Sequence, residues 1–203
     1  MYIDFLVEEE SAEVALRNLV PKIVGEDIPF NIHAYQGKLD LLEKLPRRLR
    51  GYSSWLPDDW RIVALVDGDR QDCKELKAEL EQIARGAGLV TRSMPSSGGK
   101  FHVLNRLAIE ELEAWFFGDV EALVAAYPRI PRTLQKRRGY RNPDAIGGGT
   151  WEAMERVLQK AGYYPGGLPK IEAARNISVN MDPNRNMSKS FRVFRDALRE
   201  MVA

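Results

Sequence analysis

Residues Arg61 to Val66, RIVALV, form an almost uninterrupted apolar run, and this run constrains the fold more than any other part of the chain. A strand that is apolar on both faces has to be covered on both faces, as is the central strand of a parallel sheet. Parallel strands need long crossover connections, which are usually helices. The run therefore predicts an α/β protein.

The rest of the chain has the alternation of apolar runs and amphipathic stretches that such a sheet requires. Further strands are predicted at Tyr2 to Val7, Phe30 to Tyr35, Leu89 to Met94 and Val103 to Ile109. Ser11 and Asp72 are predicted as N-caps of the helices that follow the first strand and the apolar run. We expect a mostly parallel sheet flanked by helices.

Length and charge suggest two parts. A chain of 203 residues fits one domain with an appendage. Residues 1–126 are predicted to form the α/β core, and residues 127–203 a basic, helical C-terminal extension packed on it. Residues 1–128 hold 15 Lys/Arg and 22 Asp/Glu, a net charge of −7, whereas residues 129–203 hold 15 and 7, a net charge of +8. Such asymmetry is a recognised sign of contact with nucleic acid or a membrane; mutual neutralisation within one fold is the alternative.

The sequence predicts a cytoplasmic protein with no membrane association. No apolar run reaches the length of a membrane crossing. The N-terminus lacks the basic segment and long apolar run of a secretory signal. Cys73 is the single cysteine, so no internal disulfide is expected.

Acidic residues directly follow two of the predicted strands. Glu8 begins an acidic triplet after the first, and Asp67 and Asp69 follow the apolar run. Ligands of open parallel sheets bind beyond the carboxyl ends of the strands, and neighbouring strands lie about 5 Å apart. Carboxylates that close repel one another unless a cation lies between them, and Mg²⁺ or Mn²⁺ prefers oxygen ligands. We predict a metal site here, although each acidic cluster alone is also ordinary turn or helix-start chemistry.

Three segments carry a resemblance to a known family. They are Val7-Glu8-Glu9-Glu10-Ser11-Ala12-Glu13, Leu65-Val66-Asp67-Gly68-Asp69-Arg70 and Glu110-Glu111-Leu112-Glu113-Ala114-Trp115. A glutamate after the first strand and Asp-x-Asp after a later one resemble the TOPRIM domain of topoisomerases, bacterial primases and overcoming-lysogenization-defect nucleases. Over nearly the whole chain, the sequence looks like a family of uncharacterised bacterial TOPRIM-like proteins that is associated with mobile-element or phage-defence gene sets.

The resemblance implies roles for individual residues. Glu8 matches the TOPRIM glutamate, which binds metal or acts in general acid/base catalysis, and Asp67 and Asp69 match the metal-binding aspartate pair. Lys170, in a later segment that also matches the family, is implied as a catalytic contact to the transferred phosphate. TOPRIM domains usually have glycine after the glutamate, whereas this chain has Glu9, which argues against a tight backbone approach to phosphate and offers a further ligand.

Glu110 and Glu113 form a third acidic pair, three residues apart in a predicted helix. On one helix face they would complete a second metal position, as two-metal sites need additional carboxylates. A solvated helix face is the alternative.

The segment from Tyr127 to Gly149 is rich in basic residues, prolines and glycines, and it is predicted as an exposed, partly mobile loop. Its cations alternate with tyrosines, which combines phosphate-binding charge with rings that stack on bases. The predicted nucleic-acid contacts are Arg129, Arg132, Lys136, Arg137, Arg138 and Arg141, with Arg175 and Lys189 further along the chain. Taken singly, each is also compatible with a solvated surface.

Together these features predict a Mg²⁺-dependent nuclease or related phosphodiester-processing enzyme, and the family resemblance implies a place in phage defence. Nucleic acid is the expected substrate, and the resemblance allows an ATPase as a partner protein. Residues 96–100, which lack the spacing of a Walker loop, are expected to close over the site. A non-catalytic nucleic-acid-binding or sensor module is the main alternative, and a phosphatase with Asp67 as nucleophile is a further one.

Overall fold

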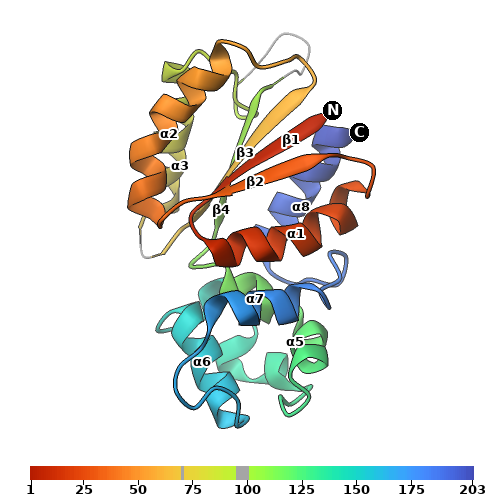
Figure 1. The fold of residues 1–203 in the computed structure, drawn as a ribbon. Helices are drawn as coiled ribbons and strands as arrows, with labels where there is room; N and C mark the ends of the chain where they lie inside the picture. The colour runs from red at the N-terminus through yellow and green to blue at the C-terminus, as the bar shows by residue number, and fades with distance from the viewer. Residues whose placement is uncertain (70, 95–100) are drawn as a thin grey trace.

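The apolar run predicted as a central strand is β3 (Trp60–Asp67) of a four-stranded parallel sheet (Figure 1). The computed structural model describes residues 1–69, 71–94 and 101–203. The other strands are β1 (Tyr2–Val7), β2 (Phe30–Ala34) and β4 (Val103–Ala108). The α-helices are α1 (Glu10–Val24), α2 (Lys38–Ser53), α3 (Cys73–Gly86), α4 (Glu113–Phe117), α5 (Val120–Ala126), α6 (Thr150–Lys160), α7 (Lys170–Ser178) and α8 (Lys189–Val202).

The strand order is β2-β1-β3-β4, and all the pairings are parallel. The order confirms the expected α/β architecture. β1 and β3 are direct neighbours in the centre, with Val7 opposite Leu65. The residues that follow these two strands therefore emerge side by side from one edge of the sheet.

Helices cover both faces of the sheet because its strands are apolar on both sides. Ile3, Phe5 and Val7 of β1 belong to a core that includes buried residues of α1 and α8. Leu6 and Val66 point the other way, into a core with α2 and α3. Residues 127–203 thus contribute α8 to the sheet half as well as α6 and α7 to the helical half.

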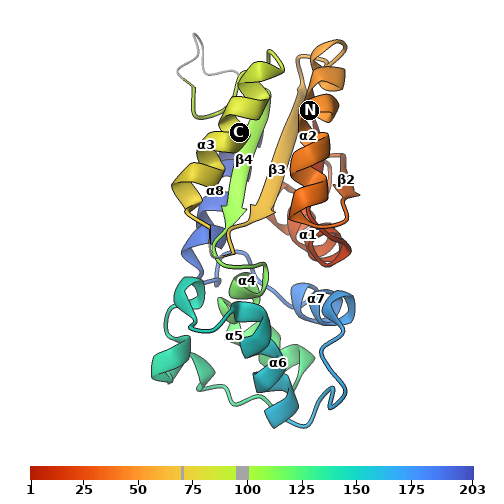
Figure 2. The same cartoon turned by 90° about the vertical axis from the view of Figure 1, so that its left-hand side faces the viewer.

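A helical half built from α4 to α7 lies beyond the carboxyl ends of the strands, and the arrowheads of β3 and β4 point toward it (Figure 2). α7 packs on α1, where the Lys22 ammonium donates hydrogen bonds to the carbonyls of Ser178, Val179 and Met181. On the other side, the fully buried Trp115 ring packs against Phe191 of α8. These contacts fix the helical half over the carboxyl edge of the sheet.

Two local predictions were wrong. Leu89 to Met94 is not a strand: it contacts β4 through a single bridge between Thr91 and Val103, and the Thr91 side chain is buried as a hydrogen-bond donor to Glu81. Ser11 is not the N-cap of α1. Glu9 holds that position in an extended conformation, and the Ser11 hydroxyl donates to its carboxylate. The predicted Asp72 cap is confirmed, because its carboxylate accepts from the amides of the first turn of α3.

The basic segment is more ordered than the predicted loop. Short 3₁₀ turns cover Leu134–Lys136, Arg138–Tyr140 and Pro143–Ala145. Ile130, Leu134 and Ile146 are buried in the core, so they anchor the segment while its basic side chains remain exposed. These few apolar residues hold the backbone of the segment in place, and the many cations between them lie on the surface.

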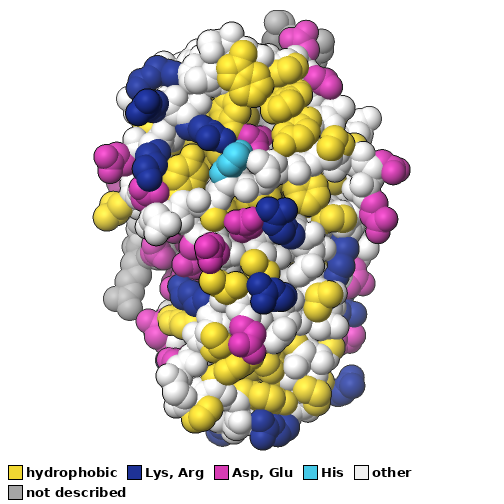
Figure 3. Space-filling view, viewed as in Figure 1, with side chains coloured by type: hydrophobic (Ala, Val, Ile, Leu, Met, Phe, Trp, Pro, Cys, Tyr) yellow, Lys and Arg dark blue, Asp and Glu magenta, His cyan; other side chains and the backbone are white. Residues whose placement is uncertain are grey.

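Basic and acidic side chains are interspersed on the face shown in Figure 3, and neither sign covers one half of it. In the described ranges, no helix combines the length and apolar character that a bilayer crossing requires.

Candidate active site at the carboxyl edge of the sheet

The candidate site lies where the strand order changes direction, between β1 and β3. From β1 the chain moves outward to β2, and it then crosses back to β3 on the other side of β1. In open α/β sheets this point leaves a crevice beyond the carboxyl ends of the two central strands, where ligands bind. Glu8 and Asp67 stand at these two ends, which is the placement that the sequence predicts.

Glu8 and Asp67 are linked directly. The Asp67 amide donates a hydrogen bond to Glu8 Oε1 over 2.7 Å. Burial raises the pKa of the Glu8 carboxyl to about 7, against the opposing effects of that amide and of Lys38. Burial, together with the charges of Glu8, Glu113 and Asp69, raises the pKa of Asp67 well above its usual range. The site therefore concentrates negative charge that the protein only partly compensates.

A tight turn after β3 separates Asp67 from Asp69. A Cβ at Gly68 would lie only 3.2 Å from the Ala108 carbonyl, so a side chain there would press against β4. Asp69 adopts a left-handed conformation with φ of 46°, and its carboxylate pairs with Lys38 over 2.5 Å. Because Lys38 begins α2 directly after β2, a third strand end supplies a cation to the site.

The helical half adds Glu113 and Lys170 to the site. Glu113 is only 4% exposed, and burial raises its pKa to about 7 although Lys170 opposes the rise. Burial lowers the pKa of Lys170, but the carboxylates of Glu113 and Glu9 outweigh this effect and leave it raised. The Lys170 ammonium lies 3.4 Å from Glu9 Oε1 and 4.8 Å from the centre of the Trp151 ring. Lys170 is therefore held as a cation beside the carboxylates.

Glu9 occupies the position where TOPRIM domains usually have glycine. Its φ of −149° is ordinary extended backbone, so this chain does not need glycine there. Its side chain points toward Lys170 and Ser11.

The expectation that Glu110 and Glu113 share a helix face is wrong. α4 begins only at Glu113, and Glu110 lies in the preceding turn with φ of 62°. Its carbonyl accepts a hydrogen bond from the Asp69 amide over 2.6 Å. Glu110 thus shapes the turn after β3 through its backbone, and Glu113 is the member of the pair whose charge acts on Asp67.

Three residues that sequence reasoning missed complete the surroundings: Lys38, Glu111 and Trp151. The Glu111 carboxylate accepts hydrogen bonds from the Thr150 hydroxyl and the Trp151 amide, and so caps α6. This contact brings the start of α6 close to the carboxyl ends of β1 and β3, where Glu8 and Asp67 lie; this part of the molecule is called the acidic edge below. Lys38 could have been found from its place after β2, whereas the contacts of Glu111 and Trp151 join segments about forty residues apart and left no local signal.

The chemistry of the donor set suits a hard divalent cation, since every candidate ligand is a carboxylate oxygen. Within the described ranges, no three His, Cys, Asp or Glu side chains are already grouped closely enough to hold one metal ion. Mg²⁺ is commonly held by only one or two carboxylates with waters and substrate oxygens. The paired ends of β1 and β3 supply that number.

All eight predicted nucleic-acid contacts are exposed, and two of them also form structural hydrogen bonds. Arg129 donates to the Gly162 carbonyl, and the Arg141 guanidinium donates to the Lys136 carbonyl. Lys189 lies at the start of α8 beside Lys77 and Arg106, in a cavity separate from the acidic edge. Residues 96–100, expected to close over the site, lie outside the described residues.

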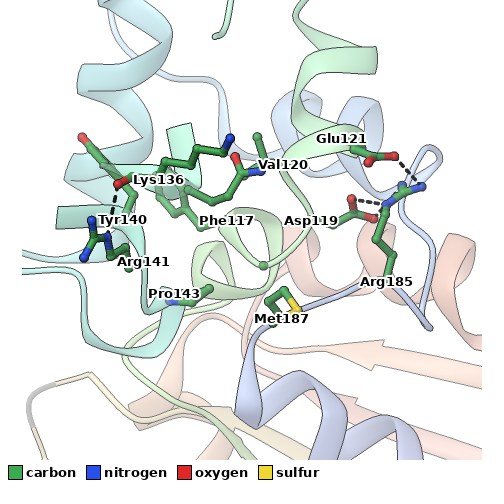
Figure 4. Close-up of a pocket in the computed structure, with 12 residues that line it drawn as sticks. Phe117, Asp119, Val120, Glu121, Lys136, Tyr140, Arg141, Pro143, Arg185 and Met187 are labelled. Carbon is green, nitrogen blue, oxygen red and sulfur yellow. Dashed lines mark hydrogen bonds and ion pairs between the residues drawn. The ribbon is translucent and has the colours of Figure 1, made fainter. Parts of the chain in front are cut away.

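A cavity of about 540 Å³ lies in the helical half, between α5 and the basic segment (Figure 4). Three of its charged residues pair with one another, whereas Lys136 and Arg141 line it without an ion pair to any described residue. The buried Asp119 carboxylate accepts two hydrogen bonds from the Arg185 guanidinium and caps α5, and Glu121 pairs with the same guanidinium. Asp119 therefore has a structural role as the N-cap of α5.

Comparison with known proteins places the chain in a family. A family model described as a domain of unknown function, DUF4276, matches residues 7–199. The chain belongs to the DUF4276 family. The matched range includes both strand ends of the acidic edge and Lys170, so the whole candidate site lies within the DUF4276 domain. Neither the curated proteins nor the solved structures contain a significant match to the chain.

The raised pKa of Glu113 predicts how the stability of the metal-free DUF4276 domain depends on pH. A carboxyl whose folded-state pKa is raised stabilises the fold below its unfolded pKa, and this contribution is lost as pH rises through the folded value. The difference between 4.5 and about 7 corresponds to roughly 3 kcal/mol. We therefore expect Glu113→Gln to raise the free energy of unfolding at pH 8 by up to that amount and to change it little at pH 4.5.

Urea unfolding in chelator at the two pH values measures this effect. Glu10→Gln, which removes an exposed carboxylate from α1, is the matched control and should change stability equally little at both. If the free energy of unfolding of Glu113→Gln depends on pH in the same way as that of the parent, ionisation of the buried Glu113 carboxyl does not destabilise the fold.

Proposed function

We propose that the protein is a Mg²⁺-dependent nuclease or a related phosphodiester-processing enzyme. One observation carries the proposal: Glu8 and Asp67 emerge from adjacent central strands at the switch point of a parallel sheet and are joined by a hydrogen bond, and Lys170 lies beside the neighbouring Glu9. Structural ion pairs rarely gather this much uncompensated acid at a ligand-binding edge. Phosphodiester chemistry uses both kinds of group, carboxylates for a metal ion and a cation for the phosphate.

Each side chain has a distinct part in this proposal. Glu8 and Asp67 would hold a Mg²⁺ ion, with Asp69 and Glu113 adding negative charge around it. The bound ion would polarise the phosphate and lower the pKa of a coordinated water. The Lys170 ammonium would contact the phosphate oxygens on which charge develops. Exposed cations of the helical half would bind the rest of the polyanion.

The TOPRIM relationship is the finer part of the proposal. Its support is the order of the motifs along the chain, together with the positions of Glu8 and Asp67 after neighbouring parallel strands. In a TOPRIM site the glutamate acts as metal ligand or general acid/base, and Glu8 would take that part. A role in phage defence and an ATPase partner extend the same resemblance.

A non-catalytic binding module is the second candidate, and two ion pairs favour it. Lys38 pairs with Asp69 and Lys170 pairs with Glu9, so the chain's own cations already neutralise part of the acidic edge. A module of this kind would retain the frame and bind nucleic acid without cleaving it.

A cleavage assay separates the two candidates. Single- and double-stranded DNA and RNA are incubated with the protein in Mg²⁺, in Mn²⁺ or in chelator. Cleavage of at least one substrate with either metal and none in chelator is expected. Binding without cleavage of any of the four substrates would favour the non-catalytic module.

A further inference from the structure

A second cavity of the helical half is lined by cations without acidic partners. It has a volume of about 630 Å³ and lies between the basic segment and α6. Arg129, Arg137, Arg156 and Lys160 line it, and no acidic residue does. Arg129 is engaged with the Gly162 carbonyl and the Tyr163 ring. The side chains of the other three form no ion pair with any residue in the described ranges.

This second cavity is called the groove below. Its cations differ from Arg185 in the cavity of Figure 4 in having no acidic partner among the described residues. There, Asp119 and Glu121 neutralise Arg185, so its charge is used within the fold. Arg156 and Lys160 of the groove lie four residues apart on the same exposed face of α6. Like charges at this spacing destabilise a helix slightly, and Glu152, four residues before Arg156, offsets part of this effect. Because no acidic side chain of the described residues lines the groove itself, its cations are free to bind an external anion.

The rest of the groove is apolar. Leu134, Val157 and Ala161 line it together with the partly buried Tyr140 ring, which packs against Phe117 at 5.5 Å between ring centres. A ligand that matches this lining carries several negative charges and also a flat apolar surface. Duplex nucleic acid shows phosphates outward and keeps its bases stacked, whereas a single strand offers phosphates and unstacked bases together.

We infer that this groove binds single-stranded nucleic acid, with phosphates on Arg137, Arg156 and Lys160 and one base against Tyr140 and the apolar wall. The inference rests on the proposed function and names the form of its substrate. It also assigns Arg156 and Lys160, which lie outside the predicted basic segment, to the binding surface.

α6 connects the groove to the acidic edge. The helix begins at Thr150 and Trp151, which bind the Glu111 carboxylate, and it ends at Lys160. The 11 residues of α6 span about 16 Å, a length that a strand of a few nucleotides covers. A single strand held in the groove can therefore extend along α6 to the carboxylates and Lys170.

Fluorescence anisotropy in chelator tests the inference without any cleavage. The probes are a labelled single-stranded oligonucleotide and a hairpin duplex of the same length, titrated at several salt concentrations. The variant Arg156→Ala/Lys160→Ala should bind the single strand about tenfold more weakly, with a salt slope smaller by about 1.4, since each phosphate contact on a single strand contributes about 0.7. Tyr140→Leu keeps an apolar side chain but no ring, and it should weaken single-strand binding at least about fivefold.

Arg47→Ala/Arg50→Ala removes the same charge from exposed positions on α2 and is the matched control, with binding equal to the parent. Parental affinity in both groove variants, or equal losses for strand and hairpin, would overturn the inference. So would a parent protein that binds no single strand. If single strands bind through the groove but no substrate is cleaved with metal, the inference stands and the proposed enzyme does not. If the groove variants keep the single-strand affinity of the parent and still cleave with metal, the proposed enzyme stands and the inference about the groove does not.

Discussion

The combined substitution Asp67→Asn and Asp69→Asn is expected to abolish Mn²⁺ binding and to reduce cleavage about a thousandfold or more, while the protein remains folded. The amide side chains keep nearly the same shape but lose the negative charge that attracts a hard cation. A metal ion that polarises phosphate and activates water supplies several kcal/mol of transition-state stabilisation, and each 1.36 kcal/mol is a factor of ten in rate. Calorimetric titration with Mn²⁺ and a cleavage assay measure the two effects.

The fold should tolerate this double change because the charges at this edge oppose folding in the absence of metal. Burial and its acidic neighbours raise the pKa of Asp67 well above its usual range, so an ionised carboxylate there is unfavourable. At neutral pH the variant should be as stable as the metal-free parent or more stable. Loss of the Asp69 ion pair with Lys38 subtracts little, since half of the Asp69 side chain is exposed.

Asp58→Asn with Asp59→Asn is the matched control for this prediction. The pair precedes β3 at its amino end, so it removes the same charge from the opposite edge of the same sheet. The control should retain the Mn²⁺ affinity of the parent. Unchanged affinity in the Asp67/Asp69 variant would count decisively against a metal site at the carboxyl edge.

The placement of these carboxylates could be predicted because it depends on local signals and one topological rule. The apolar run of β3 predicts a strand that is buried on both faces, and β1 is also mostly apolar. Once the sheet is parallel, residues after the strands must emerge at one edge. The positions of Asp67 and Glu8 could therefore be predicted from the pairing of β1 with β3, without any other long-range contact.

The wrong predictions have a different physical origin. Leu89 to Met94 has the composition of a strand, but only Thr91 forms a bridge to β4. The segment is buried because Leu89 packs in the core with α2 and α3 and because Thr91 is hydrogen-bonded to Glu81, not because it belongs to a ladder. Composition records burial and cannot tell these two arrangements apart. In the same way, the spacing of Glu110 and Glu113 suits a helix, yet the left-handed turn at Glu110 delays its start.

Contacts between the two halves of the molecule were beyond prediction. Lys170 lies 161 residues from Glu9 in the sequence, and no periodicity links them. The family resemblance, not the local sequence, singled out this lysine. Its raised pKa and its place among Glu9, Glu113 and Trp151 are consequences of how α7 docks on α1.

Lys170→Met is expected to reduce cleavage about a hundredfold to a thousandfold while leaving Mn²⁺ bound at least as tightly. Methionine fills a similar volume over Trp151 but cannot stabilise the charge that develops on phosphate oxygens, an effect of this size when one such donor is lost. Removing a cation from beside Glu9 and Glu113 makes the edge more negative, so the affinity for Mn²⁺ should not fall. Single-turnover cleavage and calorimetry give the two quantities.

The opposite responses of rate and metal affinity distinguish a phosphate contact from a structural role. If Lys170 only held the acidic edge together, its loss would disturb metal binding and cleavage alike, whereas a contact specific to the transition state lowers kcat and leaves KM nearly unchanged. Lys170→Arg, which keeps the charge, should recover part of the rate, and Lys44→Met on the exposed side of α2 should behave as the parent. A Lys170→Met variant with parental kcat would show that the ammonium serves the fold alone. Another cation would then have to contact the transferred phosphate, and Lys38, which begins α2 and pairs with Asp69, is a candidate.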